Sequence, residues 1–290
     1  MVRSLATKSI VLPMLKHMLA GQSRTCPPPP PPQSNNPDRF QEPLVAVRLP
    51  NGIQRMKKLE KLSHVEVSNS IDDMMGIGQL LRLRKLGVIL HRKKRDGSLD
   101  LLFQQIKKLH HCLHSLSIQI NHPATNEDII HDDAANIHPL ALPPKLLRSL
   151  NIRGIRNGLP RWITCETLLG EDALGTIGNL GALACLRLLH KSCNTSKLHI
   201  KKGQLRGLKS LIVRGCEITN IEFDHLSASP NLEMIVWSFN RMEAMYGLGW
   251  LRFLKKVELN GECDADLMGG QLDGRVEFKH NGQLVPKGRR

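Results

Sequence analysis

The sequence of 290 residues is poor in aromatic side chains and lacks several motifs that mark catalysis. Phe, Trp and Tyr together make up only 3% of the chain, whereas leucine contributes 46 residues. The glycine-rich phosphate loop G-x-x-x-x-G-K-[ST] is missing, and so are G-x-S-x-G and H-E-x-x-H. We therefore predict no enzyme, no catalytic residue, no bound nucleotide and no other cofactor.

The sequence also lacks paired cysteines, paired metal ligands and any segment that could span a membrane. The seven cysteines form no Cys-x-x-Cys pair and no regular framework, so free thiols in a reducing compartment are expected. His110, His111, Cys112 and His114 crowd together without a second ligand pair, so we predict no metal site. No apolar run reaches the ~18 residues that a transmembrane helix needs. The formal net charge of +15 permits an acidic protein, a nucleic acid or an anionic membrane as partner, but it identifies none of them.

The first 37 residues contain no acidic side chain. An acid-free leader of this kind resembles an organelle transit peptide, and a disordered start is the alternative. Pro27 to Pro32 form an uninterrupted run of six prolines, which predicts a stiff spacer. We expect residues 1–43 to form a disordered basic leader outside the folded part of the chain.

Residues 204–221 carry apolar side chains at a spacing that fits neither a helix nor an ordinary strand. The pattern L-x-x-L-x-L-x-x-N/C-x-L, typical of a leucine-rich repeat, is matched by Leu208, Leu211, Val213, Cys216 and Ile218. Because side chains alternate across a strand, Leu211 and Val213 should point to one side. One such coil cannot bury its own apolar face, so the pattern requires stacked neighbours.

The core pattern L-x-x-L-x-L occurs eight times. Between second apolar positions the steps are 21, 30, 34, 36, 25, 24 and 22 residues, and the outer steps are typical of leucine-rich repeats. Alternation with a period of two argues against a leucine-rich helical protein. Asn121 and Asn240 occupy the place of Cys216. The eight units are Leu62-Val65-Val67, Leu83-Leu86-Val88, Leu113-Leu116-Ile118, Leu147-Leu150-Ile152, Leu183-Leu186-Leu188, Leu208-Leu211-Val213, Leu232-Ile235-Trp237 and Leu254-Val257-Leu259.

We predict an α/β leucine-rich-repeat solenoid over residues 44–264, with a curved parallel sheet on the concave face and short helices and loops on the convex face. Helical spacing of leucines predicts a true helix at the start of residues 98–120. Residues 121–144 are expected to form an exposed loop. The basic cluster 82–95 predicts a solvated loop, with a nuclear signal or a phosphate patch as alternatives. Residues 265–290 should form a non-repeat tail, either a hairpin cap or disordered.

Four segments, residues 83–90, 101–120, 143–163 and 229–261, resemble the leucine-rich-repeat region of plant intracellular disease-resistance receptors, and most of all the coiled-coil type of cereals. The resemblance covers about residues 44–264. It implies repeats that sense pathogen-derived ligands or host proteins and that hold an adjacent nucleotide-binding switch at rest. Because the phosphate loop is missing and the leader is unlike the family's coiled coil, we expect a truncated form or a fragment without that switch.

The resemblance leads us to expect a protein-interaction or ligand-sensing module that acts in defense, in the cytoplasm. A generic leucine-rich-repeat adaptor unconnected with immunity is the alternative function. An organelle, reached through residues 1–37, and the nucleus are the alternative locations. The expected partner is a protein, either a pathogen effector or a host protein, rather than a nucleic acid.

The side chains between the leucines of each strand are the candidates for partner binding. In x-L-x-L-x the x positions point to solvent on the concave side, and parallel strands place successive x residues side by side. We predict a line of arginines beside an apolar patch, because arginine is enriched at binding hot spots. This predicted surface consists of Arg153, Arg187, Arg214, Leu189, Ile212 and Val236.

Overall fold

The computed structural model of the chain describes eight stretches, which form two compact units, one up to residue 154 and one from residue 181 onward. The described residues are 12–19, 47–67, 71–91, 98–121, 144–154, 181–189, 196–215 and 217–285. Several predictions concern parts of the chain outside these residues and stay predictions. They are the proline run, the basic residues 92–95, the loop 122–143 and the packing of Cys216.

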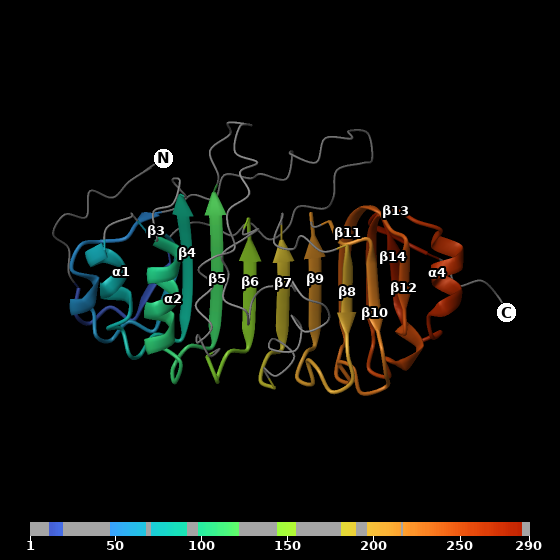
Figure 1. Ribbon diagram of the computed structural model, residues 1–290, viewed down its shortest axis with the longest axis horizontal. Helices are drawn as coiled ribbons and strands as arrows, with labels where there is room; N and C mark the ends of the chain where they lie inside the picture. The colour runs from blue at the N-terminus through green and yellow to red at the C-terminus, as the bar shows by residue number, and fades with distance from the viewer. Residues whose placement is uncertain are drawn as a thin grey trace. The chain divides into compact units, whose positions relative to one another are not determined.

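A parallel sheet organises the first unit, and most of its strands lie side by side in chain order (Figure 1). The order is β1-β3-β4-β5-β6, and β2 also pairs with β3. Leu62, Leu86, Leu116 and Leu150 lie opposite one another in one fully buried row. The strands are β1 His17–Leu19, β2 Val47–Arg48, β3 Lys61–Val67, β4 Lys85–His91, β5 Ser115–Asn121 and β6 Ser149–Arg153.

Short helices connect these strands. The predicted helix is confirmed as α2, Ser98–Lys108, and its apolar side chains Leu102 and Ile106 are buried. A second helix, α1 (Ile71–Ile77), lies beside α2, and the 3-10 turn η2 (Ile53–Arg55) precedes β3 (Figure 1).

The second unit has a main sheet of the same kind, in the order β7-β9-β11-β13-β14-β15. All its pairs are parallel except the hairpin of β14 and β15. Across it, Leu186, Leu211, Ile235 and Val257 form a fully buried row. The strands are β7 Cys185–Leu189, β9 Ser210–Arg214, β11 Met234–Arg241, β13 Lys256–Glu262, β14 Glu277–His280 and β15 Gln283–Leu284. All eight repeats therefore contribute a strand with parallel neighbours, as predicted.

A second sheet covers the other side of this core and was not foreseen from the sequence. Its three parallel strands are β8 (Lys197–Ile200), β10 (Asn220–Phe223) and β12 (Ala244–Tyr246). Each of its strands alternates buried apolar residues with partly exposed ones, such as Ile221 and Phe223 with Asn220 and Glu222 in β10. Here strands replace the helices expected on the convex side.

The register of the first repeat differs from the prediction. The sequence pattern made Val65 the equivalent of Leu86, but Leu62 lies opposite Leu86 and Val65 lies opposite Val88. This assignment was wrong because the strand contains a bulge with one extra residue. His64 sits in that bulge with a φ of 59°, a backbone conformation that spacing alone does not reveal.

Part of the expected leader is ordered. Residues 17–19 form β1 and pair in parallel with residues 61–63, while β2 pairs with residues 65 and 66 of the same strand. The backbone nitrogens of Glu60 and Lys61 donate to the carbonyl oxygen of Lys16 at 2.7 and 3.0 Å. The expectation of a disordered leader therefore does not hold for residues 17–19, because pairing satisfies the edge of β3.

At the other end, residues 265–285 form α4 (Ala265–Gln271) and the β14–β15 hairpin. Asp264 caps α4, its carboxylate accepting from the Leu267 backbone nitrogen at 2.9 Å. Since β14 pairs in parallel with β13, the sheet continues past residue 264. The division of the chain at residues 43 and 264 stays a prediction. Among the described helices, none is long and apolar enough to cross a bilayer.

Candidate functional site

The open face of the second unit's main sheet is formed by the x positions of the repeats, because the leucine positions are buried. Strand register decides which x residues are neighbours. One row consists of Arg187, Ile212, Val236, Glu258 and Lys279, and the next consists of Leu189, Arg214, Ser238 and Asn260.

The three predicted apolar residues are placed close together on this face. Ile212 lies directly opposite Val236, and Leu189 lies one strand and one row away from Ile212. Val236 is only 5% exposed, whereas Ile212 and Leu189 are half-buried. The apolar centre of this face is thus largely buried at Val236 and more exposed to solvent toward β7.

The predicted line of arginines is not formed by Arg187 and Arg214. Arg187 lies opposite Ile212, and Arg214 lies opposite Leu189, so the two guanidinium groups belong to different rows. The reason is that Arg187 is the middle x residue of its strand and Arg214 is the last. Arg153 belongs to the first unit, where it lies opposite Gln119, and burial lowers its pKa.

Carboxylates also occupy the open face, so it is not uniformly basic. Lys256 Nζ lies 3.0 Å from Glu258 Oε2, and Lys279 Nζ lies 3.1 Å from Glu277 Oε1. Burial raises the pKa of Glu258, but hydrogen bonds from Lys256 and Asn260 and the nearby positive charges outweigh it and hold that pKa below its ordinary value. Toward β13 and β14 the face becomes a lattice of alternating charges.

The histidines near Cys112 contact backbone carbonyl oxygens of their own turn. Nδ1 of His114 lies 2.7 Å from the Cys112 carbonyl oxygen, and Nδ1 of His110 lies 3.0 Å from the Lys107 carbonyl oxygen. Burial raises the pKa of the Cys112 thiol, which disfavours the thiolate. In the described part of the chain, no three His, Cys, Asp or Glu side chains gather as a metal site would require.

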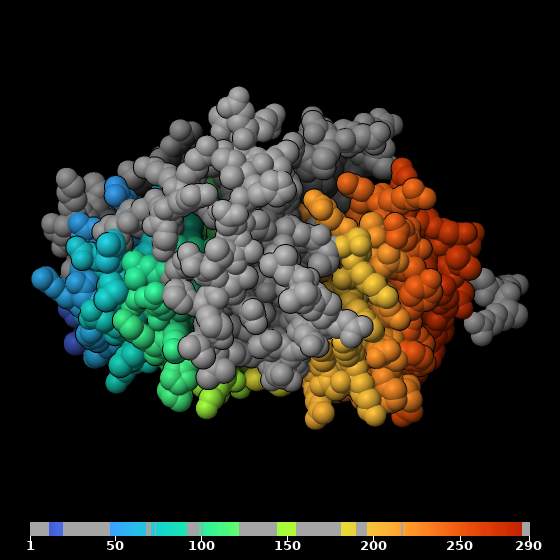
Figure 2. Space-filling view, in the orientation of Figure 1, coloured from blue at the N-terminus to red at the C-terminus, as the bar shows by residue number. Residues whose placement is uncertain are grey.

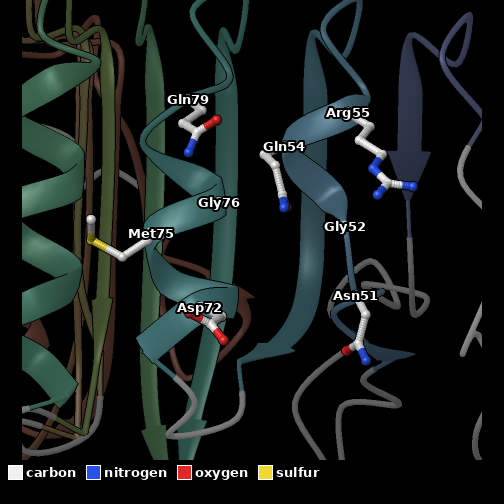
Figure 3. A pocket seen from close by; sticks show the side chains of 8 residues that line it. All are labelled: Asn51, Gly52, Gln54, Arg55, Asp72, Met75, Gly76 and Gln79. Carbon is white, nitrogen blue, oxygen red and sulfur yellow. The ribbon is translucent and has the colours of Figure 1, made fainter.

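A polar hollow of about 440 Å³ lies in the first unit between η2 and α1 (Figure 3). Gly52, with a φ of 78°, forms the turn that leads into η2. Arg55 and Asp72 supply charges of opposite sign to the lining of the hollow. The hollow is open to solvent and combines few apolar side chains with scattered polar ones. That chemistry is unlike the mostly apolar lining of small-molecule sites.

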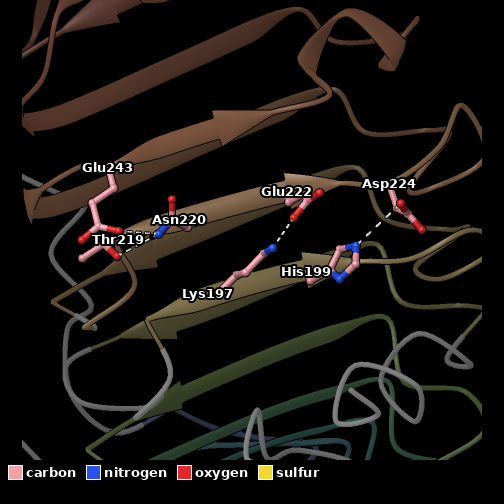
Figure 4. A network of polar contacts seen from close by, with 7 residues as sticks. All are labelled: Lys197, His199, Thr219, Asn220, Glu222, Asp224 and Glu243. Atoms are coloured by element: carbon pink, nitrogen blue, oxygen red, sulfur yellow. Dashed lines mark hydrogen bonds and ion pairs between the residues drawn. The ribbon is translucent and has the colours of Figure 1, made fainter. Parts of the chain in front are cut away.

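The outer face of the second sheet carries a network of polar contacts (Figure 4). Lys197 Nζ lies 2.5 Å from Glu222 Oε2, and this hydrogen bond raises the pKa of Lys197 and lowers the pKa of Glu222. Asn220 donates to Glu243 Oε2 at 2.7 Å, and His199 lies 3.8 Å from Asp224. Lys197 with Glu222, and Asn220 with Glu243, hydrogen-bond across neighbouring strands, which favours a structural role.

The sequence interpretation missed an exposed aromatic segment. Tyr246, Trp250 and Phe253 are 60%, 41% and 58% exposed and lie within eight consecutive residues. The signal was available, because these residues are a dense group in a chain with few aromatic side chains. It was overlooked because the segment was interpreted only through its leucine spacing.

Comparison with known proteins agrees with this architecture. Residues 43–271 match the family model described as "Leucine-rich repeat region". The match extends over most of the described residues of both units and includes the eight repeat strands.

Several curated relatives from rice are similar to the chain. Disease resistance protein PIK6-NP of Oryza sativa subsp. japonica is 26% identical over 236 residues, which cover 70% of this chain and 22% of that protein. Disease resistance proteins Pik-2 and Pikm2-TS of the same organism are each 25% identical over 236 residues, with the same coverage. The chain thus spans about a fifth of the length of these relatives.

Proposed function

The chain belongs to the leucine-rich repeat region family, and from this premise we propose that it is a protein-interaction or ligand-sensing module that acts in plant defense. The observation that carries the proposal is the open strand face of a repeat array whose relatives are disease resistance proteins. Stacked repeats of this kind bind partners through extended surfaces rather than through a closed pocket. The partner is a pathogen effector or a host protein.

Chemistry on the open face supports a binding role. Half-buried apolar side chains at Ile212 and Leu189 lie next to Arg187 and Arg214 on neighbouring strands about 4.8 Å apart. Such a mixture of apolar area and arginine is typical of binding hot spots. We propose no catalytic role, and we place the protein in the cytoplasm.

Affinity capture tests this function. The full-length chain serves as bait for extracts of healthy and pathogen-infected cereal leaf, and bound proteins are identified by mass spectrometry. We expect at least one partner that binds directly when purified, with saturable affinity, and that is enriched from infected tissue. If no purified candidate binds directly, or if partners do not differ between tissues, the defense assignment is wrong.

A further inference from the structure

Exposure divides the aromatic residues of the described chain into two groups. Five of the eight are buried, as expected for large apolar side chains. The other three are Tyr246, Trp250 and Phe253, and all of them lie in residues 246–253. Exposed aromatic side chains that gather in one segment mark an interaction site rather than ordinary surface.

This segment is held firmly, so the exposed rings do not result from a loose loop. Leu248, Leu251 and Leu254 are 4–5% exposed and already fill the interior side. Trp250 N donates to the Gly247 carbonyl oxygen at 3.2 Å, and Leu251 N donates to the Leu248 carbonyl oxygen at 3.0 Å. The turn therefore anchors its leucines inside and presents its rings outside.

Neighbouring turns extend the exposed surface. The backbone nitrogens of Gly203 and Ser229 bond the 201–209 turn to the 224–233 turn at 3.1 Å each, and Lys255 N bonds the 247–255 turn to Glu233 O at 2.8 Å. Leu226 adds a further exposed apolar side chain. Together these turns form the rim at the start of the strands, seen in yellow and orange along the lower edge of Figure 2. We call this surface the aromatic rim, defined by Leu226, Tyr246, Trp250 and Phe253.

The charges around the aromatic rim are mainly positive. Glu233 is shared by Lys209 at 3.6 Å and Lys255 at 2.7 Å, and Arg275 contacts Asp273 at 2.8 Å. Three further exposed cations make no ion pair within the described residues, namely Lys202, Arg206 and Arg252. The rim therefore offers apolar anchors surrounded by unneutralised positive charge.

We propose that the aromatic rim is a docking site for a protein segment that carries aliphatic or aromatic side chains flanked by Asp or Glu. The inference rests on the proposed binding function and assigns it a second surface, separate from the open strand face. Trp, Tyr and Arg are the residues that dominate binding hot spots, and Arg252 lies between two of the exposed rings in the sequence. Acidic flanks complement the net positive charge.

A nucleic acid fits this surface less well. Aromatic stacking and cations also bind single strands. However, Asp224 and Glu233 stand in the same turns, Asp273 lies in the turn before β14, and all three would repel a phosphate backbone. A folded or extended protein segment can direct its few acidic side chains at the exposed cations and avoid these carboxylates.

The test uses the full-length chain and a random-peptide display library. We expect enriched peptides that combine Leu, Phe or Trp with Asp or Glu. A Trp250→Ala/Phe253→Ala double variant should weaken their binding by about tenfold or more. The matched control is Leu267→Ala/Leu284→Ala, which removes two exposed side chains from α4 and β15 and should leave binding unchanged.

Charge-reversal variants distinguish recognition of acidic peptide residues from nonspecific hydrophobic binding. Arg252→Glu should weaken the same peptides several-fold, whereas Arg241→Glu, at the opposite end of the strands, should not. The inference is overturned if no peptide is enriched, if enriched peptides lack acidic residues, or if the double variant binds like its control. Preferential, rim-dependent binding of an oligo-dT strand or of phosphatidylserine vesicles would also overturn it. If the double variant binds the enriched peptides like the wild type while purified leaf partners still bind the full-length chain, this inference fails and the proposed function stands.

Discussion

The rings of Trp237 and Phe239 meet edge to face inside the second unit, with their centroids 4.7 Å apart. Trp237 is fully buried and lies opposite Val213 on one side and Leu259 on the other. It is the largest fully buried side chain in a core made mainly of leucine, isoleucine, valine and phenylalanine. This pair therefore decides how β11 packs between its two neighbours.

Replacing Trp237 tests that role. Trp237→Ala should cost about 3–5 kcal/mol of unfolding free energy, because it leaves a cavity that stacked strands cannot close. Trp237→Phe should cost much less, because the indole Nε1 is buried and has no hydrogen-bond partner among the described residues. Urea unfolding measures both. Phe253→Ala, at an exposed ring, is the control and should change stability by less than about 0.5 kcal/mol.

Leu211 lies at the centre of a fully buried row, between Leu186 and Ile235. Leu211→Ala should cost about 2–5 kcal/mol. Because each repeat is stabilised by its nearest neighbours, amide exchange should accelerate first in β7 and β11. Amide protection that stays unchanged in both flanking strands would contradict the stacking register.

Two nearby glycines offer a matched pair. Gly247 has a φ of 80°, and a Cβ there would lie 2.2 Å from the Phe223 carbonyl oxygen, whereas a Cβ at Gly249 would meet nothing within 4 Å. Gly247→Ala should therefore destabilise the protein by more than about 1 kcal/mol. Gly249→Ala should be nearly neutral. Equal melting temperatures for the two variants would show that the 247 turn is not constrained as described.

Acidification should weaken the ion pair of Glu258 and Lys256. Because the folded protein holds the pKa of Glu258 below its ordinary value, the charged carboxylate stabilises the fold above pH about 4.3. That contribution is lost as the pH falls through the lowered folded pKa. The difference in unfolding free energy between wild type and Glu258→Gln should therefore shrink as the pH falls below about 4.3.

Most of the architecture can be predicted from the sequence, because the spacing of the leucines determines which side chains must be buried together. Leu211 and Val213 must face one interior, and only stacked parallel strands provide it. The first repeat was assigned to the wrong register because the strand bulges at His64. The bulge adds one residue, so Leu62 rather than Val65 lies opposite Leu86. The second sheet was missed because strands such as residues 220–223 are too short for alternation to be distinctive.

The candidate surface was only partly predictable for a similar reason. Spacing places Ile212 and Val236 at x positions, but Val236, expected to point to solvent, is only 5% exposed. The rows in turn depend on which x position of each strand is used. Arg187 and Arg214 both occupy x positions of their repeats. Arg187 is the middle x residue of its strand and Arg214 is the last, so the two lie in neighbouring rows of the sheet. The aromatic rim depends on which residues of a turn point outward, and turn conformation is not encoded by leucine periodicity.

The open strand face is tested by charge reversal of its arginines. If partners bind there, changing Arg187 and Arg214 together to Glu should abolish capture of proteins that the wild type retains, since reversed charges repel what the arginines attract. The positive charge of Arg214 helps to lower the pKa of Glu258, so Arg214→Glu would repel that carboxylate, and folding of the double variant is checked by circular dichroism. Arg187→Glu alone avoids that repulsion, because Arg187 is exposed and lies opposite Ile212. It should weaken binding about tenfold, whereas the exposed Arg241→Glu, with the same charge change, should have no effect. Retention of every partner by a folded Arg187→Glu protein would show that this face does not bind them.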